Sequence, residues 1–179
     1  MRVTIEGRGL HNSPMAIRVA ILTVSDRGSR GERDDKSGPA LAAWVTERGV
    51  EVASTAIVAD EQSEISSALR EWADGGEIDL ILTTGGTGVS PRDVTPEATA
   101  TVLERVIPGF GEAMRAASLR KTVKAVLSRS SCGVRGRTLI LNLPGSPVAA
   151  VENLEAVWDA VPHAVRKIQG DMEDCVPVK

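Results

Sequence analysis

The glycine-rich segment Thr84-Gly85-Gly86-Thr87-Gly88 is the part of the sequence best suited to chemistry. Neighbouring glycines let backbone N–H groups approach a phosphate closely and adopt positive φ without a clash at Cβ. Thr84 and Thr87 add hydroxyl donors. The segment lacks the Gly-Lys-Ser/Thr of a P-loop, and Pro91 stands where a dinucleotide fingerprint has its third glycine. A tight turn that uses glycine only for its geometry explains the segment equally well, so it is a candidate phosphate cradle.

Two aspartates are candidates for metal-assisted chemistry near these glycines. Asp60 ends a predicted strand in Val58-Ala59-Asp60-Glu61, and Asp93 follows the glycines in Arg92-Asp93. Ligands of open α/β sheets bind outside the carboxyl ends of the strands, so both carboxylates can reach one crevice. Magnesium-assisted nucleotidyl transfer requires such a pair. Taken alone, each aspartate is more typical of a turn or a helix cap.

Two further loops follow predicted strands. Ser25-Asp26 comes after the first strand, and Pro144-Gly145-Ser146 precedes a helix that Pro147 begins, where N–H and hydroxyl groups can meet an anion. An ordinary turn explains either loop too. We interpret the charged stretch from Arg27 to Lys36 as a mobile solvated loop, and closure of this loop over a ligand is the alternative.

Other reactive side chains give no catalytic pattern. The two histidines, His11 and His163, form no trio with a serine and an acid, and Cys132 is interpreted as a hairpin residue without chemistry.

The elements that position these residues alternate between strands and helices. Buried strands are predicted from Arg18 to Ser25 and over 79–84, because both runs are apolar and β-branched. A third strand covers 50–58, and 125–143 holds a strand, a turn and a second strand at Thr138–Leu143. Helices are predicted over 39–48, 64–73 with Ser63 as cap, 96–105 with Thr95 as cap, 110–120, and from Pro147 to about Ile168. This order favours an α/β fold with a mostly parallel sheet that is covered on both faces.

The composition fits a single folded domain of ordinary type. The chain has 179 residues, 42% hydrophobic residues and a net charge of -3, which gives no general attraction to nucleic acid or to an anionic membrane. Aromatic residues make up 2% of the chain, which argues against stacking on single-stranded nucleic acid. Two cysteines and no long apolar run favour a cytoplasmic protein outside the membrane. We predict an irregular leader over 1–16, one domain over 17–170 and a tail over 171–179.

Several motifs in order resemble the MogA/MoaB family of molybdenum cofactor biosynthesis proteins. They are TVSDRGSRGERDDKSG, VADE, TTGGTGVSPRDVTPEAT, PGFGEAMR, LSRSSCGV and LILNLPGSP, and the resemblance covers about Arg18 to Gly170. It is greatest to the MogA-like branch, whose members transfer AMP from ATP to molybdopterin and release pyrophosphate.

The resemblance implies a three-layer α/β/α sandwich of the molybdopterin-binding type, a magnesium-dependent reaction and a homotrimer. It implies that Asp60 and Asp93 are the essential carboxylates and candidate magnesium ligands. Thr84, Gly85, Gly86, Thr87 and Gly88 would hold nucleotide phosphates, while Ser25, Asp26, Pro144, Gly145 and Ser146 would line the pocket for pterin or nucleotide. A partner protein for molybdenum insertion is also implied. Ala59 stands where the family commonly has proline, which affects the rigidity of the loop more than its chemistry.

Three other functions stay open on the sequence. A MoaB-like member would bind the pterin with little or no adenylyl transfer. A trimeric scaffold would present the same pocket without catalysis, and a nucleotide pyrophosphatase would use the same loop to bind its substrate.

Overall fold

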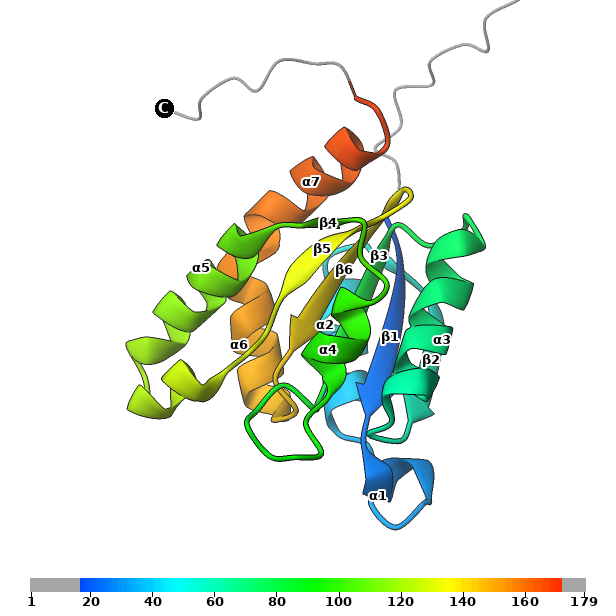
Figure 1. Cartoon of the computed structure of the whole chain (residues 1–179). Coiled ribbons are helices and arrows are strands. Elements are labelled where there is room, and N and C mark those ends of the chain that lie inside the picture. The colour runs from blue at the N-terminus through cyan, green and yellow to red at the C-terminus, as the bar shows by residue number, and fades with distance from the viewer. Residues whose placement is uncertain (1–16, 172–179) are drawn as a thin grey trace, which may run out of the picture.

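A six-stranded sheet forms the centre of the structure, a computed structural model that describes residues 17–171 (Figure 1). The strand order is β2-β1-β3-β6-β5-β4. Four neighbouring strands are parallel: β2 (Glu51–Val58), β1 (Arg18–Val24), β3 (Leu80–Thr84) and β6 (Thr138–Leu143). β5 (Cys132–Arg135) runs antiparallel to β6, and β4 (Arg105–Val106) antiparallel to β5. The prediction of a mostly parallel sheet is confirmed.

The three neighbouring strands β1, β3 and β6 are buried on both faces. All residues of β3 and β6 are buried, and so are all residues of β1 except Arg18. Their sequences are runs of Leu, Ile, Val and Thr, as expected for strands that helices cover on both sides. β2 lies at the edge and alternates between exposed and half-buried positions over most of its length.

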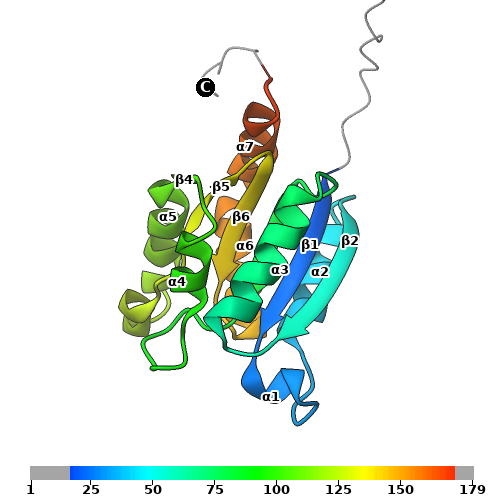
Figure 2. The ribbon, with the colours of Figure 1, turned by 45° about the vertical axis from the view of Figure 1, so that its right-hand side comes forward.

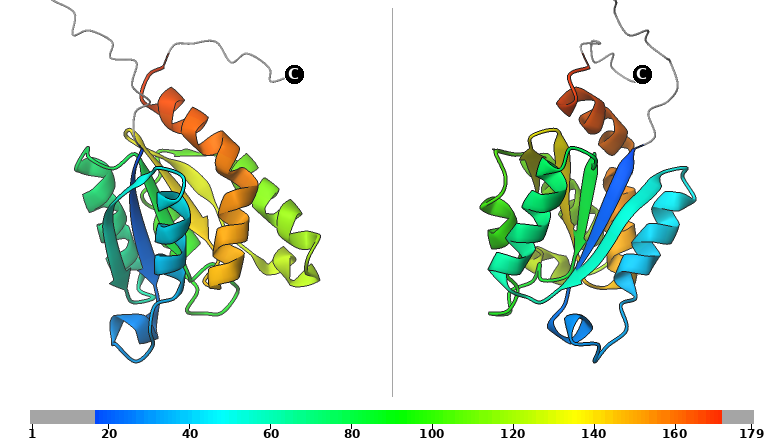
Figure 3. Two further views of the ribbon diagram at one scale, coloured as in Figure 1. Left: turned by 180° about the vertical axis from the view of Figure 1, so that it is seen from behind. Right: turned by 90° about the vertical axis from the view of Figure 1, so that its right-hand side faces the viewer.

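Helices cover both faces of the sheet, so the fold is the predicted three-layer α/β/α sandwich. α3 (Gln62–Asp74) and α4 (Thr95–Ala100) pack on one face around Ile65, Leu69 and Ala98 (Figure 2). The other face is covered by α2 (Ser37–Thr46), α5 (Pro108–Leu119), α6 (Pro147–Val157) and α7 (Val161–Ile168), as seen from behind in Figure 3. Since each face buries its own apolar cluster, the sheet is a rigid base for the loops at its carboxyl edge.

Several predicted boundaries differ from the structure. The predicted helix over 96–105 ends at Ala100, and Arg105–Val106 form the short strand β4, because the chain returns to the sheet edge beside β5. The predicted helix over 110–120 begins at Pro108 and ends at Leu119. The C-terminal helical region is divided into α6, the 3-10 helix η2 (Trp158–Ala160) and α7. A second 3-10 helix, η1 (Val123–Leu127), precedes β5.

Two predicted helix caps are wrong. Ser63 lies inside α3, whose N-cap is Glu61, and Thr95 is the first residue of α4 rather than its cap. The hydroxyl of Thr95 instead donates to the carbonyl oxygen of Gly85 at 2.9 Å. The side chain therefore ties α4 to the glycine segment.

Three predictions about the ends of the chain are not tested. The predicted leader over 1–16, with His11, and residues 172–179 of the tail lie outside the described residues, so the division into domains stays a prediction. Within residues 17–171, no helix is long and apolar enough to span a membrane.

Candidate active site

The loops that follow β1, β2, β3 and β6 meet at the carboxyl edge of the sheet, at the lower end of Figure 1. Two pockets open there. The first, of about 530 Å³, is lined by Ser25, Asp60 and Ser146 among others. The second, of about 410 Å³, is lined by Thr87, Asp93 and Lys124 among others. Gly86 and Gly145 line both pockets. Each pocket is large enough for a small-molecule ligand.

Glycine is required at two positions of the predicted cradle. Gly85 has φ +102°, and a Cβ there would lie 2.2 Å from the carbonyl oxygen of Val24. Gly86 has φ +62°, and its Cβ would lie 2.3 Å from the hydroxyl oxygen of Thr95 and 3.2 Å from Oδ1 of Asp60. No side chain fits either position without movement of the neighbouring atoms. The glycines therefore form a tight turn, as one of the two interpretations predicts. This geometry does not by itself decide whether the backbone N–H groups of the turn bind a phosphate.

The backbone N–H groups at this turn differ in whether they already have a hydrogen-bond acceptor within the protein. The N–H of Gly85 donates to the carbonyl oxygen of Leu143 at 3.2 Å. Among the described residues, no acceptor is found for the N–H groups of Gly86, Thr87 and Gly88. Three consecutive free donors at the junction of two pockets are suited to phosphate oxygens.

The two threonine hydroxyls of the segment lie in different surroundings. Thr84 is fully buried, and its hydroxyl donates to the carbonyl oxygen of Pro144 at 2.8 Å. This bond joins the loops that follow β3 and β6, so in this structure the hydroxyl holds the loops together and is not the predicted free donor. Thr87 is also buried and lines the second pocket.

Asp60 and Asp26 are linked by a reciprocal pair of hydrogen bonds. The N–H of Asp26 donates to Oδ2 of Asp60 at 2.7 Å, and the N–H of Asp60 donates to Oδ1 of Asp26 at 3.1 Å. Burial raises the pKa of the Asp60 carboxyl above its ordinary value, although the N–H of Asp26 opposes this. Burial thus disfavours the charged form of Asp60, and a cation bound nearby would favour it.

Arg92 binds both carboxylate oxygens of Asp26. Its Nε donates to Oδ2 and its Nη2 to Oδ1 of Asp26, at 3.0 and 2.8 Å, and Nη2 also contacts Glu61 at 2.8 Å. The hydrogen bonds to Arg92 lower the pKa of Asp26. A cation and a carboxylate from two separate loops are thus paired beside Asp60.

Asp93 lies in the second pocket, which shares Gly86 and Gly145 with the pocket of Asp60. Its Oδ2 accepts the N–H of Ser90 at 2.7 Å and lies 2.9 Å from the Cβ position of Gly88. Lys121 and Lys124 also line this pocket, and Lys121 pairs with Glu152 at 2.7 Å. The structure thus places the two aspartates in adjoining pockets.

The remaining predicted residues frame the first pocket. The hydroxyl oxygen of Ser25 accepts the N–H of Gly28 at 3.1 Å and caps the short helix α1 (Asp26–Ser29). Ser146 caps α6, so the positive end of that helix lies at the pocket. A Cβ on Gly145 would lie 3.2 Å from Cα of Gly85, which shows how closely the two loops approach.

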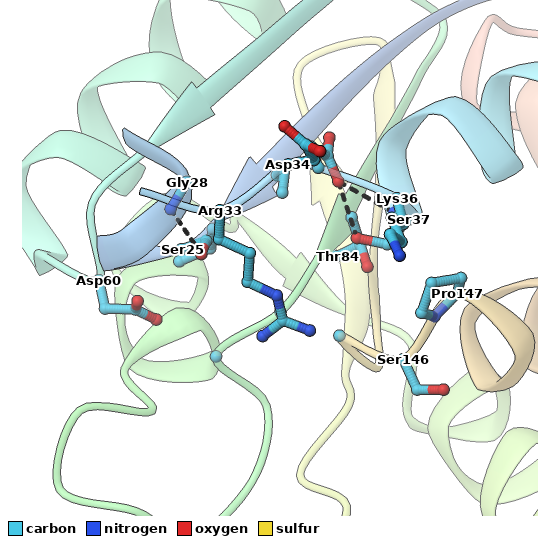
Figure 4. A pocket seen from close by; sticks show the side chains of 16 residues that line it. Ser25, Gly28, Arg33, Asp34, Lys36, Ser37, Asp60, Thr84, Ser146 and Pro147 are labelled. Carbon is cyan, nitrogen blue, oxygen red and sulfur yellow. Dashed lines mark hydrogen bonds between the residues drawn. The ribbon is translucent and has the colours of Figure 1, made fainter. Parts of the chain in front are cut away.

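The residues after α1 were not among the predicted site residues, although closure of this stretch over a ligand was the alternative interpretation. The stretch interpreted as a solvated loop lines the first pocket with Arg33, Asp34, Asp35 and Lys36, and Figure 4 shows the side chain of Arg33 between Ser25 and Ser146. Asp35 accepts the hydroxyl of Thr23 at 2.7 Å and the N–H of Ser37 at 2.9 Å. These bonds fasten the stretch to β1 and α2. The position of the stretch, directly after the first strand, was the available signal.

The donors present fit a magnesium ion that arrives with a nucleotide. Within residues 17–171, no group of three or more His, Cys, Asp or Glu side chains could hold a metal ion. Magnesium is commonly held by one or two carboxylates together with substrate phosphates and water. Asp60, with its raised pKa, and Asp93 supply such a partial set beside the free N–H groups.

Comparison with known proteins gives consistent matches over most of the chain. The family model described as a probable molybdopterin binding domain matches residues 20–163. The molybdopterin adenylyltransferase of Helicobacter pylori J99 is 44% identical over 157 residues, which are 87% of this chain and 89% of that protein. The molybdopterin adenylyltransferase of Escherichia coli K12 is 40% identical over 175 residues, with 90% of each chain covered. The crystal structure of the molybdopterin biosynthesis enzyme MoaB from Thermus thermophilus superposes with a TM-score of 0.82 at 54% identity, covering 87% of this chain and 98% of that chain.

Proposed function

The chain belongs to the molybdopterin-binding domain family, and from this premise we propose that it transfers an adenylyl group from ATP to molybdopterin in molybdenum cofactor biosynthesis. The observation that carries the proposal is the set of three N–H groups, from Gly86 to Gly88, at the junction of two pockets. A reaction that joins two phosphate-bearing substrates needs such a junction.

The reaction needs no strong base. A terminal phosphate oxygen of molybdopterin attacks the α-phosphorus of ATP, the bond from that phosphorus to the bridging oxygen breaks, and pyrophosphate leaves with the electron pair. The attacking phosphate is already ionised at neutral pH. Catalysis therefore depends on position and on stabilisation of negative charge, which the N–H groups of the glycine turn supply.

The carboxylates have a separate role in the proposal. Asp60 and Asp93 would hold a magnesium ion that arrives with ATP, and the ion would neutralise phosphate charge. Asp26, held by Arg92, keeps Asp60 in place through the reciprocal backbone bonds. Ser25, Thr84, Gly85, Pro144, Gly145 and Ser146 shape the pocket walls.

Assembly as a homotrimer in the cytoplasm completes the proposal. The apolar side chains of Leu119, Val123, Val126 and Leu127 at the end of α5 and in η1 are between 45% and 76% exposed, and a neighbouring subunit would cover them. The free thiol of Cys132 is buried, which fits a reducing compartment that also supplies ATP. Transfer of the product to a molybdenum-insertion partner protein belongs to the same proposal. Sedimentation equilibrium tests the trimer directly.

A direct assay tests the proposed reaction. Purified protein is incubated with ATP, magnesium and molybdopterin, and the adenylylated pterin and pyrophosphate are measured together. Equal amounts of the two products are expected. Pyrophosphate without adenylylated pterin would instead indicate a pyrophosphatase, and the absence of both products, in an assay validated with an active enzyme, would refute the proposal.

A MoaB-like binding function is the second candidate. The 54% identity to the MoaB of Thermus thermophilus favours it, because it exceeds the identities of 44% and 40% to the two adenylyltransferases. Tight binding of molybdopterin without product in the same assay would support this candidate.

A further inference from the structure

Arg129, to which the sequence patterns assign no role, contacts the loop that carries Asp93 at several points. It lies between η1 and β5, and its Nε donates to the carbonyl oxygen of Gly88 at 2.6 Å. Its Nη2 donates to the carbonyl oxygen of Asp93, and its Nη1 pairs with the carboxylate of Glu97. One guanidinium thus binds both ends of the loop between Gly88 and Asp93.

The backbone of Arg129 controls a third peptide group of the same loop. Its N–H donates to the carbonyl oxygen of Thr87 at 2.9 Å. Because the C=O and N–H of a trans peptide point in opposite directions, this bond turns the N–H of Gly88 away from Arg129. That N–H is one of the three free donors of the glycine turn.

The segment that carries Arg129 is itself held in place. Nη1 of Arg115, in α5, donates to the carbonyl oxygen of Ser130 at 2.9 Å. A Cβ on Gly111 would lie 2.7 Å from the same oxygen, so α5 packs tightly against the segment. Arg129 is therefore fixed to a helix on one side and to the loop on the other.

The loop has few other bonds that would hold its shape. Its internal bonds are those from the N–H of Asp93 to the carbonyl oxygen of Ser90, at 2.9 Å, from the N–H of Ser90 to Oδ2 of Asp93, at 2.7 Å, and from the N–H of Arg92 to the hydroxyl oxygen of Ser90, at 3.4 Å. These bonds lie within one turn and leave its orientation to the sheet free. The side chain of Arg92 ties the loop to Asp26 and Glu61, and the contacts from Arg129 hold both of its ends.

We propose that Arg129 is a positioning residue that sets the N–H of Gly88 and the carboxylate of Asp93 for transfer of the adenylyl group. The inference rests on the proposed function. Lysine cannot replace Arg129, because only the planar guanidinium offers several donors in a fixed fork to two carbonyl groups and a carboxylate.

Three variants test the role of Arg129. Arg129→Ala removes all side-chain contacts, and Arg129→Lys keeps the charge beside Glu97 without the fork. The matched control is Arg135→Ala, since Arg135 also binds a carbonyl oxygen, that of Val102 at 3.1 Å, and a carboxylate, that of Asp74 at 2.7 Å. Arg135 lines neither of the two pockets.

We expect a loss in kcat without a comparable change in KM. Displacement of a reacting group by about 1 Å costs roughly 100-fold in rate, so Arg129→Ala should lose about that factor in kcat while KM for ATP changes less than about threefold. Arg129→Lys should fold like the wild type and recover less than about a tenth of the lost rate. Arg135→Ala should lose stability but keep its kcat.

Amide hydrogen exchange gives a readout that does not depend on activity. Arg129→Ala and Arg129→Lys should both exchange faster than the wild type in a peptide covering 86–94, whereas Arg135→Ala should not. If the wild type transfers no adenylyl group, the proposed function fails while this measurement still tests the contacts of Arg129. Wild-type exchange over 86–94 in both Arg129 variants, wild-type kcat in either of them, or an equal loss of kcat in Arg135→Ala would overturn the inference.

Discussion

Substitution of Gly86 by alanine tests whether glycine is required there because of the close contact with Thr95 and Asp60, or only because the turn has a positive φ. The new Cβ would lie 2.3 Å from the hydroxyl oxygen of Thr95 and 3.2 Å from Oδ1 of Asp60. The left-handed backbone at φ +62° adds its own cost of about 1–2 kcal/mol for a residue with a side chain. Overpacking against fixed neighbours adds roughly 1–3 kcal/mol.

A second glycine separates the two contributions. Gly136 lies in the hairpin between β5 and β6 with φ +53°, and a Cβ there would meet nothing within 4 Å. Gly136→Ala should therefore show the backbone cost alone. The difference in unfolding free energy between the two variants then measures the contact with Thr95 and Asp60, and we expect about 1–3 kcal/mol by urea denaturation.

Turnover provides the second part of this test. Because the Cβ of Gly86→Ala pushes toward Asp60, adenylyl transfer should fall by about 100-fold, whereas Gly136→Ala should keep its rate. Equal stability of the two variants together with normal turnover of Gly86→Ala would refute the reasoning that Gly86 is fitted to the carboxylate.

Three further predictions concern the charged residues. Asp93→Asn should keep the melting temperature and lose about 100- to 1000-fold in kcat, and unchanged turnover would remove Asp93 from the mechanism. Asp60→Asn should also lose turnover, but it should be more stable than the wild type at pH 7, because burial raises the pKa of Asp60 above 3.8 in the folded protein. The native state then binds more protons than the unfolded state above pH 3.8, so the stability of the wild type falls as the pH rises toward the folded pKa. In urea denaturation, the difference in unfolding free energy between variant and wild type should be absent at pH 3 and present at pH 7. An equal difference at both pH values would contradict this. Arg92→Gln should raise the pKa of Asp26 toward its ordinary value in an NMR titration of the carboxyl carbons, since hydrogen bonds from Arg92 lower that pKa; an unchanged titration would exclude the pairing in solution.

The central strands and the edge that carries the site could be predicted from local sequence. Runs such as Leu-Ile-Leu-Thr-Thr in β3 are too apolar for an exposed strand, and the Gly-Gly and Pro-Gly pairs mark where the chain turns after β3 and β6. The three-layer fold follows from the alternation of strands and helices. Both are properties of segments a few residues long.

Features that depend on distant contacts were not predictable. Two residues of β4 carry no strand pattern of their own, and they are a strand only because β5 lies beside them. The sequence around Thr95 is typical of a helix cap, but its hydroxyl donates to the carbonyl oxygen of Gly85, 10 positions earlier in the chain. The role of Arg129 depends on carbonyl groups between 36 and 41 positions earlier in the chain, which no local pattern encodes.

A crystal structure with magnesium and an ATP analogue that carries a methylene bridge between the α- and β-phosphorus tests the central claim most directly. We predict that phosphate oxygens lie within hydrogen-bonding distance of the N–H groups of Gly86, Thr87 and Gly88, with the metal ion between those phosphates and the carboxylates of Asp60 and Asp93. Phosphates bound instead to Lys121 and Lys124, with the three N–H groups facing water, would contradict the account.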